Sequence, residues 1–593
     1  MTVYVAPVKD MMFVLEEVAG LDEVTALPGC DEVGADLVSA VLEEAGRLAE
    51  EVIAPLNKTS DQQGATFANG EVKTSPGFKA AYKQFAEGGW VGLTCDPDYG
   101  GQGLPFLLSI PVSEIWNSAS TSFALCPMLT SGAIEALTHH ASDTLKATFL
   151  PKMISGEWTG TMNLTEPNAG SDLAAVRTKA VPTGDHYLIS GTKIFITYGE
   201  HDYTDNIIHL VLARLPDAPA GVKGISLFVV PKFLVNADGS LGERNDAKCV
   251  SIEHKMGIHG SPTAVMAFGE EAGAIGYLVG EANRGLEYMF TMMNNARLAV
   301  GLEGVGIAER AYQQALAYST DRVQGRVVGR EGTLPIAYHP DVRRMLMSMR
   351  SQTEAMRALA FVAATAMDKA ARCENAEEQK RHQARIDLLI PVVKAWCTEQ
   401  ANEIAYTGVQ VHGGMGFIEE TGAAQHQRDA RITTIYEGTT GIQANDLMGR
   451  KVARDGGEAA NALIAEMRET VAAARADSAL SGLGDALAAA VDDLKTATDW
   501  IVANYSGNTA ATLVGAVQYL KLFGTVAGGW VLVKSALAAQ SKLSAGQGDV
   551  TFLKQKVATV RFYADQVLPL SASALTILKR GQSSLEAADV ALG

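Results

Sequence analysis

The chain has 593 residues, of which 47% are hydrophobic and 20% charged, and its formal net charge is -18. This length exceeds what one hydrophobic core can organise and predicts about three or four domains of an ordinary globular protein. The acidic balance argues against a nucleic-acid partner, because such binding needs clustered Lys and Arg to displace counterions. The six cysteines are scattered without a C-x-x-C pair, which predicts a reduced compartment and neither a zinc site nor a disulfide framework.

The chain carries no clear signal for export or for membrane insertion. Residues 1–10 lack a basic region followed by an apolar core, and we therefore expect a cytoplasmic protein. The most membrane-like stretch, residues 512–539, is interrupted by Gln518, Lys521 and Lys534, so its apolar runs fall short of the roughly 20 residues of a membrane span. We expect a buried pair of helices there and no membrane partner.

The predicted elements divide the chain into four parts. Residues 1–155 are predicted to be helical, with an amphipathic pattern over residues 37–56 and Pro55 near the end of that helix. Residues 156–282 are rich in predicted strands, which favours a small barrel or sandwich; these strands are residues 187–197, 207–212, 225–230, 265–268 and 274–279.

Helices return in the second half of the chain. Residues 283–469 contain three long predicted helices, at 289–318, 339–371 and 381–406, which are long enough for bundle packing. Residues 325–338 form a predicted loop between the first two. Residues 470–593 are predicted to form an appended helical domain.

A loop and a strand at the start of the β-rich part could face a planar ring. In residues 162–172, Pro and Gly hold the backbone open, so that hydroxyls and N–H groups can point toward a heteroaromatic ligand; an ordinary interdomain turn is the alternative. Phe195 and Thr197 lie two residues apart on a strand and share one face, which suits ring packing plus one hydrogen bond. A core phenylalanine is the alternative for that strand.

Two further stretches could contact a dinucleotide. Arg322 lies where a long helix breaks, and its guanidinium could fork onto a pyrophosphate, although a solvated basic turn is the commoner case. Residues 408–417 combine Gln410 with several glycines that allow close backbone approach to a ligand; a Gly-rich helix end is the alternative. No G-x-G-x-x-G or Walker sequence is present, so a cofactor would not be bound by a Rossmann unit.

The strongest catalytic candidate is Glu437, the only charge between Arg431 and Asp446. It lies between a β-branched and aromatic run and a Gly/Thr-rich turn, with Thr439 or Thr440 placed to cap the helix that follows. Apolar surroundings disfavour the charged carboxylate and raise its pKa toward the range of a general base. The alternative is a solvated acid stabilised by a helix N-terminus.

Taken together, in this order and over residues 35–455, these motifs resemble the acyl-CoA dehydrogenase family of flavoproteins. The most specific parts are residues 165–172 and 435–439. The length and the appended domain are similar to the long-form subgroup that contains the 3-methylmercaptopropionyl-CoA dehydrogenases of dimethylsulfoniopropionate breakdown. The resemblance implies an α+β multidomain fold: an N-terminal helical domain, a middle β domain, a C-terminal four-helix-type domain and the appended helical domain.

The resemblance also implies roles for individual residues. Glu437 would be the catalytic base, and no metal site is implied. The implied FAD contacts are Met162, Leu164, Thr165, Ser171, Phe195, Ile196, Thr197, Arg322, Gln410, Gly413, Gly414 and Thr439. The implied substrate contacts are Ser171, Arg297, Tyr436 and Gly438. Two positions depart from the family pattern: Gly441 stands where many members have Gln, and Asn294 where an acidic residue is usual.

The implied reaction is α,β-dehydrogenation of a short-chain acyl-CoA thioester, with 3-methylmercaptopropionyl-CoA as the expected substrate. Glu437 would take the α-proton, and the hydride would pass to flavin N5. Electrons would leave through an electron-transfer flavoprotein, and the chain would form a homodimer or a dimer of dimers. The alternatives are a general short- or medium-chain dehydrogenase, an acyl-CoA oxidase and, from another class, a non-enzymatic flavoprotein that binds DNA.

Overall fold

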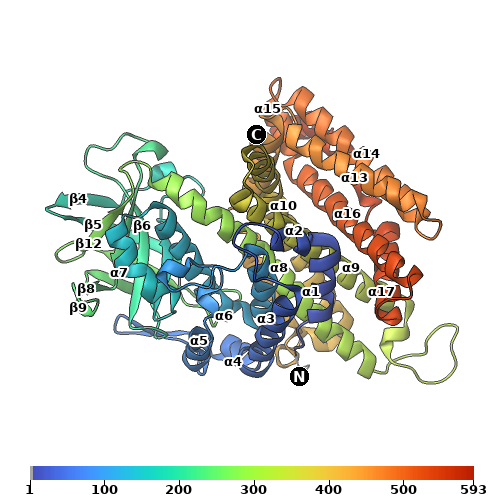
Figure 1. Cartoon of the computed structure of the whole chain (residues 1–593), viewed down its shortest axis with the longest axis horizontal. Coiled ribbons are helices and arrows are strands. Elements are labelled where there is room, and N and C mark those ends of the chain that lie inside the picture. The colour runs from blue at the N-terminus through green and yellow to red at the C-terminus, as the bar shows by residue number, and fades with distance from the viewer. Residues whose placement is uncertain (1–3, 593) are drawn as a thin grey trace. The chain divides into compact units, whose positions relative to one another are not determined.

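The computed structural model describes residues 4–592, which form two compact units. The first unit contains residues up to Gly46, Pro105–Ser118 and the chain from Arg297 onward, and the second contains Arg47–Leu104 and Ala119–Ala296. Two long helices, α6 (Phe106–His140) and α8 (Gly285–Asp321), contribute residues to both units (Figure 1). Helix α6 contains one non-helical residue, Ser120, close to the point where it passes from the first unit to the second.

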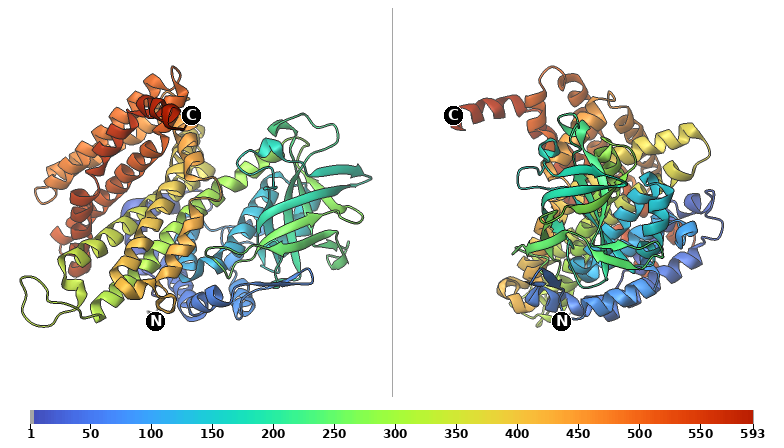
Figure 2. Two further views of the ribbon diagram at one scale, coloured as in Figure 1. Left: turned by 180° about the vertical axis from the view of Figure 1, so that it is seen from behind. Right: turned by 90° about the vertical axis from the view of Figure 1, so that its left-hand side faces the viewer.

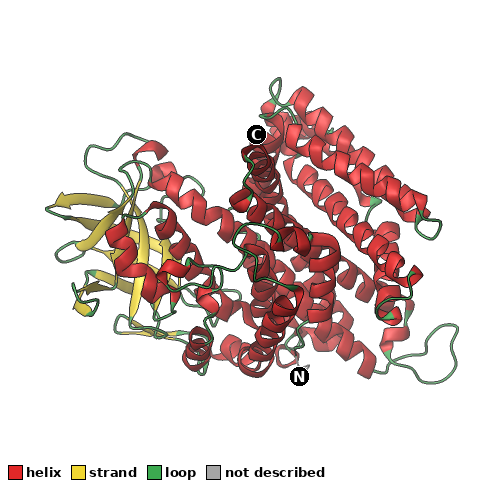
Figure 3. Ribbon diagram, viewed as in Figure 1, coloured by secondary structure: helices red, strands yellow, loops and turns green. Residues whose placement is uncertain are grey.

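The second unit combines short helices with the main β-sheet (Figure 3). Its helices are α4 (Ala54–Gln63), α5 (Phe78–Glu87) and α7 (Asp143–Ile154). Its strands are β1 (Thr66–Ala68), β2 (Glu71–Lys73), β3 (Trp158–Asn163), β4 (Lys179–Thr183), β5 (His186–Thr197), β6 (Asn206–Ala213), β7 (Ser226–Pro231), β8 (Phe233–Val235), β9 (Leu241–Arg244), β10 (Ala247–Ile252), β11 (Thr263–Phe268) and β12 (Ala274–Val279).

Eight of these strands form one sheet in the order β10-β11-β5-β12-β7-β6-β3, with β4 paired to β5. All the pairs are antiparallel except β3 and β6, which run parallel. The long strand β5 pairs with β11 through its C-terminal half and with β4 and β12 through its N-terminal half. The order of strands ends at β10 and β3, but β4 also joins the far side of the sheet: Thr178 and Ala180 exchange backbone hydrogen bonds with Arg214, the residue after β6. Strands β5, β12, β7, β6 and β4 therefore close into a ring, which agrees with the small barrel that the sequence predicted as one of two alternatives.

The N-terminal part differs from the all-helical prediction at two places. Strands β1 and β2 form a hairpin, with Asn69 and Gly70 at the turn in positive φ, which is the backbone that a tight hairpin requires. Pro55 lies in the first turn of α4, inside a stretch that is helical without a break from Ala35 to Gln63. A short π-helical segment (Ala49–Ile53) separates α4 from α3 (Ala35–Leu48). The sequence predicted Pro55 near the end of a helix, and this was wrong because the helical stretch continues to Gln63.

The first unit is helical throughout its described elements of regular structure. Besides α3 and parts of α6 and α8, its α-helices are α1 (Val8–Val14), α2 (Leu21–Thr25), α9 (Pro340–Arg372), α10 (Ala376–His412), α11 (Ala423–Thr433), α12 (Thr440–Asn445), α13 (Glu458–Ala476), α14 (Ser481–Asn504), α15 (Thr509–Val514), α16 (Ala516–Ser544), α17 (Val550–Gln566), α18 (Leu570–Leu578) and α19 (Gly581–Leu592). Figure 2 shows the antiparallel bundle that the long helices make. The three long helices predicted between residues 289 and 406 are confirmed as α8, α9 and α10.

Helix α16 is the membrane-like stretch of the sequence. It is one continuous helix of 29 residues, not the predicted pair, and 78% of its most apolar window is buried inside the protein. Gly524 and Gly528 let it approach Trp396 of α10, since a Cβ at Gly524 would lie 2.2 Å from the Trp396 ring. Among the described helices it alone is long and apolar enough to cross a membrane, and its burial against α9 and α10 accounts for that composition.

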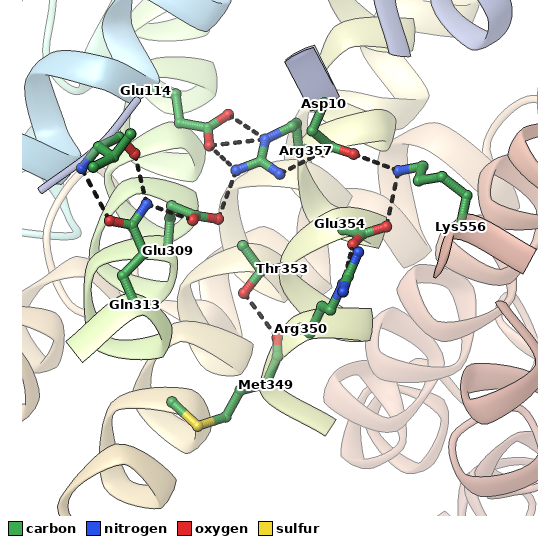
Figure 4. Close-up of polar contacts among 11 residues, drawn as sticks. Asp10, Glu114, Glu309, Gln313, Met349, Arg350, Thr353, Glu354, Arg357 and Lys556 are labelled. Carbon is green, nitrogen blue, oxygen red and sulfur yellow. Dashed lines mark hydrogen bonds and ion pairs between the residues drawn. The ribbon is translucent and has the colours of Figure 1, made fainter. Parts of the chain in front are cut away.

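A buried network of charges joins distant parts of the first unit (Figure 4). Arg357 of α9 makes ion pairs with Asp10, Glu114 and Glu309, from three other helices. Lys556 of α17 makes ion pairs with Asp10 and Glu354, and Arg350 with Glu354. Asp10 and Glu354 each have two cationic partners, whereas Glu114 and Glu309 depend on Arg357 alone within this network. Because breaking a buried ion pair is costly, the network fixes α1 and α17 against α9.

Candidate active site

The loop that carries Glu437 lies in the first unit between α11 and α12. Thr439 caps α12, since its hydroxyl oxygen accepts a hydrogen bond from the Ile442 N–H at 3.3 Å; of the two threonines considered, the structure uses Thr439. Glu437 has a φ of 51° and Gly438 a φ of 85°. A non-glycine residue in this left-handed region costs about 1–2 kcal/mol, so the surrounding contacts must hold it there.

Three buried side chains hold this loop. Lys394 of α10 donates to the carbonyls of Thr433 and Gly438, at 2.9 and 2.7 Å. Gln443 of α12 donates from its side-chain amide to the Glu437 carbonyl at 3.1 Å. The Tyr436 hydroxyl donates to the carboxyl group of Glu303 on α8. The backbone on both sides of the Glu437 side chain is therefore fixed from three different helices.

Opposing influences set the charge of Glu437. Burial is the largest and raises its pKa, while the nearby charges of Arg297 and Lys394 lower it; the pKa remains above its ordinary value. This is the direction that the sequence predicted from the apolar surroundings. A carboxylate with a raised pKa accepts a proton more readily at neutral pH than an exposed one, which suits a general base.

Arg297 of α8 lies close enough to Glu437 to influence its pKa. The guanidinium is mostly buried and makes a long ion pair of 3.8 Å with Asp446, while its Nε has no hydrogen-bond partner among the described residues. A buried donor of this kind is expected to meet a ligand or water. Tyr436, in contrast, directs its hydroxyl to Glu303, so a substrate contact would use its ring or backbone.

The loop at residues 162–172, in the second unit, is organised by a buried ion pair that the sequence analysis did not identify. Glu166 accepts hydrogen bonds from Lys193, from the Thr178 hydroxyl, and from the N–H groups of Arg177 and Thr178. Burial raises the pKa of Glu166, but the Lys193 charge and these hydrogen bonds outweigh it and the pKa is lowered. Lys193 also donates to the Leu164 carbonyl, and the Thr165 carbonyl accepts from the Ile194 N–H at 2.9 Å.

These contacts bring the loop and strand β5 side by side within the second unit. Phe195 is 58% exposed and has a φ of 61°, so strand β5 presents its aromatic ring to the outside from a strained backbone position. Thr197 is half-buried, and its backbone pairs with Thr263 of β11. A large exposed ring in a strained conformation fits stacking against a flat ligand better than it fits a core role.

The other predicted contacts on this unit differ in how a ligand could reach them. Ile196 is buried in the hydrophobic core of the sheet, and Met162 is buried in β3, so only their backbone atoms are available to a cofactor. Leu164 and Thr165 are half-buried and Ser171 is exposed. The side-chain contacts predicted here therefore depend on Leu164, Thr165 and Ser171.

The residues predicted to contact the dinucleotide lie on the first unit. Arg322 follows the end of α8 and is exposed, and Gln410 is exposed on the last turn of α10. Gly413 ends α10 with a φ of 60° and requires glycine for that reason. Gly414 has open space where a Cβ would lie, so the packing of the chain does not demand glycine there. A ligand that approaches the backbone would account for it.

On the second unit, an exposed ring beside an open polar loop fits a flavin ring. On the first unit, an exposed Arg and Gln with two exposed glycines fit the dinucleotide part of such a cofactor. No group of acidic, His or Cys side chains in residues 4–592 could hold a metal ion. The buried residues Lys394, Glu303, Lys193 and Glu166 were missed by the sequence analysis. The sequence feature that could have identified them is a single charged residue within an apolar run. Lys394 within residues 388–397 and Glu303 within residues 298–307 are examples.

Comparison with known proteins places the chain in a family. Family models described as the acyl-CoA dehydrogenase N-terminal domain, middle domain and C-terminal domain match residues 38–157, 161–270 and 283–452. A fourth, described as acetyl-CoA dehydrogenase C-terminal like, matches residues 463–589. The chain therefore belongs to the acyl-CoA dehydrogenase family; it is an oxidoreductase that dehydrogenates acyl-CoA, and its cofactor is FAD.

Individual relatives match over nearly the whole length. The chain is 50% identical to 3-methylmercaptopropionyl-CoA dehydrogenase of Ruegeria pomeroyi, over 98% of this chain and 99% of that protein. It is 35% identical to a butyryl-CoA dehydrogenase of Syntrophomonas wolfei, over 98% of each. Among solved structures, Caenorhabditis elegans ACDH-11 in complex with C11-CoA shares the fold, with a TM-score of 0.77 at 21% identity, over 96% of this chain and 92% of that one.

Proposed function

We propose that this protein oxidises 3-methylmercaptopropionyl-CoA to its α,β-unsaturated thioester, with Glu437 as the base. The observation that carries the catalytic role is the Glu437 loop: one half-buried carboxylate, in a strained conformation, held by three buried side chains and facing two cations. The substrate is inferred from the 50% identity to the Ruegeria pomeroyi enzyme that carries this name.

In the proposed reaction the bond between Cα and Cβ becomes a double bond as two hydrogens leave. The Glu437 carboxylate takes the α-proton, and its backbone N–H donates to the thioester carbonyl, which acidifies the α-carbon. FAD, when bound, supplies the acceptor for the β-hydrogen as a hydride. Phe195 would stack on the flavin, and Thr165 and Thr197 would bond to its polar edge. Arg322 and Gln410 would bind the dinucleotide half of an FAD held mainly by another subunit. Arg297 and Ser171 orient the substrate.

The remaining parts of the proposal concern the protein's surroundings. We place the enzyme in the cytoplasm, as a homodimer or a dimer of dimers, and we assign an electron-transfer flavoprotein as the acceptor of its electrons. With this substrate, the enzyme would act in dimethylsulfoniopropionate breakdown. A methylthiopropionyl chain and a butyryl chain are nearly isosteric, and apolar pockets separate such pairs by only about 1–3 kcal/mol. Activity toward butyryl-CoA is therefore expected as well.

The test is anaerobic mixing of the FAD-bound protein with 3-methylmercaptopropionyl-CoA, butyryl-CoA or octanoyl-CoA while the absorbance of the oxidised flavin is followed. Rapid bleaching by the first two and slow bleaching by the third is the expected result. A protein that octanoyl-CoA bleaches fastest would refute the substrate. Glu437→Gln should keep its FAD yet lose bleaching by about 100- to 10,000-fold, and near-normal bleaching would refute its role as the base.

The electron acceptor is tested separately. The reduced protein should return its electrons quickly to an electron-transfer flavoprotein or an artificial one-electron acceptor, and slowly to dissolved oxygen. Fast reoxidation by oxygen, with release of hydrogen peroxide, would identify the enzyme as an acyl-CoA oxidase.

A further inference from the structure

We propose that Lys394 and Glu303 are positioning residues for the reaction: they hold the backbone around Glu437 in the conformation from which its carboxylate acts. Lys394 holds the loop through two backbone carbonyls, and Glu303 holds it through Tyr436. Neither side chain is proposed to touch the substrate. The inference rests on the proposed role of Glu437 as the base.

Lys394 holds the loop at two points, one on each side of the base. Its side chain is fully buried, and its ammonium group donates to the carbonyl of Thr433, four residues before Glu437, and to that of Gly438, the residue after it. Thr433 is the last residue of α11, so the cation also lies at the negative end of a helix dipole. Burial lowers the pKa of Lys394 to about 8 although Glu437 and Glu303 oppose that change, and the group is mainly charged at neutral pH.

Glu303 supplies the third constraint through hydrogen bonding more than through charge. Its side chain is fully buried; one oxygen accepts from the Tyr436 hydroxyl, and the other has no hydrogen-bond partner among the described residues. Burial raises the pKa of Glu303 to about 8, so the carboxyl group is mainly neutral at pH 7. The Tyr436 hydroxyl therefore requires an acceptor oxygen, and the side-chain amide of a glutamine could supply one in place of the Glu303 carboxyl group.

The strain at Glu437 gives these contacts a functional meaning. A loop with Glu437 at a φ of 51° relaxes unless its neighbours prevent it, and a displacement of about 1 Å can slow an enzyme about 100-fold. Lys394 also acts on the charge of the base. Several groups surround Glu437: the cations Arg297 and Lys394, the carboxyl of Glu303, the hydroxyl of Tyr436, and Asp446 beside Arg297. Of these, Arg297 and Lys394 are the two that lower the Glu437 pKa.

A purely structural role for Lys394 and Glu303 would give a different result, and the rate of flavin reduction as a function of pH separates the two. The FAD-bound protein is mixed anaerobically with saturating butyryl-CoA, and thermal stability is measured in parallel. The variants are Lys394→Met, Glu303→Gln, Glu303→Leu and Tyr436→Phe. The matched control is Lys534→Met, which removes another largely buried lysine that donates to a carbonyl, that of Val18 at 2.9 Å.

Positioning predicts a specific pattern. Lys394→Met slows flavin reduction about 100-fold, and the acid limb of the profile moves up by about one pH unit because a charge that lowered the Glu437 pKa is gone. Glu303→Leu and Tyr436→Phe slow the reaction without moving the limb, and Glu303→Gln, which keeps the acceptor, retains more activity than Glu303→Leu. Lys534→Met lowers stability only.

Variants that lose stability but reduce the flavin at the wild-type rate, with the wild-type limb, would overturn the inference. If Lys394→Met does not fold, the other three variants decide. Wild-type rates of flavin reduction in Glu303→Gln, Glu303→Leu and Tyr436→Phe would overturn the inference as well. Failure of the proposed function is recognised separately, because Glu437→Gln would then retain normal flavin reduction. If Glu437→Gln no longer reduces the flavin while Lys394→Met reduces it at the wild-type rate, the positioning role alone is refuted.

Discussion

Replacing Lys556 by Met tests whether the buried charge network holds the first unit together. The Lys556 ammonium is 1% exposed and lies 2.6 Å from Asp10 and 2.8 Å from Glu354. Methionine fills much of the same space but leaves two carboxylates with one cation fewer. Each retains one arginine: Asp10 keeps Arg357 at 2.8 Å, and Glu354 keeps Arg350 at 2.7 Å.

The expected loss follows from these contacts. Removing one partner of a buried ion pair costs about 3–5 kcal/mol, and the arginines that remain place this case near the lower end, at about 3 kcal/mol. At roughly 2–4 °C per kcal/mol for a domain of 150–250 residues, the melting temperature should fall by up to about 6–12 °C. The assay is thermal unfolding of the FAD-bound protein, followed by circular dichroism at neutral pH.

Lys9→Met is the matched control, since Lys9 pairs with Asp549 at 2.5 Å but both side chains are about half exposed, at 59% and 48%. It should change the melting temperature far less, because water screens an exposed pair. Asp10→Asn combined with Lys556→Met should lose less stability than the sum of the two single changes, since each removes the same pair. A Lys556→Met protein that melts within about 1 °C of wild type would refute the reasoning.

Three further outcomes are expected. Gly524→Ala should lower the melting temperature measurably, because its Cβ would lie 2.2 Å from the Trp396 ring in a closely packed helix pair; unchanged melting would show that α10 and α16 can separate freely. Lys193→Met should weaken FAD binding, measured by flavin release on dilution, because Glu166 loses its cation and the loop that it organises loosens; retention equal to wild type would contradict this. Stability should also depend on Asp10 in acid. Burial raises its pKa, but the charges of Lys556 and Arg357 bring it from 3.8 to about 2. A lowered folded-state pKa stabilises above the unfolded value, so this contribution should vanish as pH falls from about 4 to about 2, and Asp10→Asn should lack that part of the acid transition.

The long helices could be predicted because their apolar periodicity is local. The helix predicted at residues 381–406 is α10, which runs from Ala376 to His412, because Asn375 caps its start and Gly413 can adopt the positive φ that ends it. Residues 512–539 were predicted as a pair of helices because Gln518, Lys521 and Lys534 interrupt the apolar run. In the structure Gly524 and Gly528 serve to admit Trp396, which is 128 residues away along the chain from the first of them, and no local pattern reports such a contact.

The candidate site likewise combines a feature that is local in the sequence with contacts between residues far apart in the chain. Glu437 could be named as a candidate base from the sequence because an isolated carboxylate in an apolar and glycine-rich loop is visible within a few residues. Its supports could not, because Lys394 precedes Gly438 by 44 positions and Glu303 lies 133 positions from Tyr436. A charged residue inside an apolar run indicates that it has a polar partner in the fold, but the pattern does not identify that partner. Ile196 shows the converse: a position taken from a binding motif has its side chain in the core of the sheet.

The appended C-terminal helices are part of the same core as the bundle that carries Glu437. Helix α16 packs along α9 and α10, with Trp396 seated against its glycines, and Lys556 of α17 is buried between Asp10 and Glu354. Lys394 lies two residues before Trp396 on the same helix. The part of α10 that holds the Glu437 loop is therefore packed on its other side by residues beyond 470, and these residues stabilise the helix on which that loop depends.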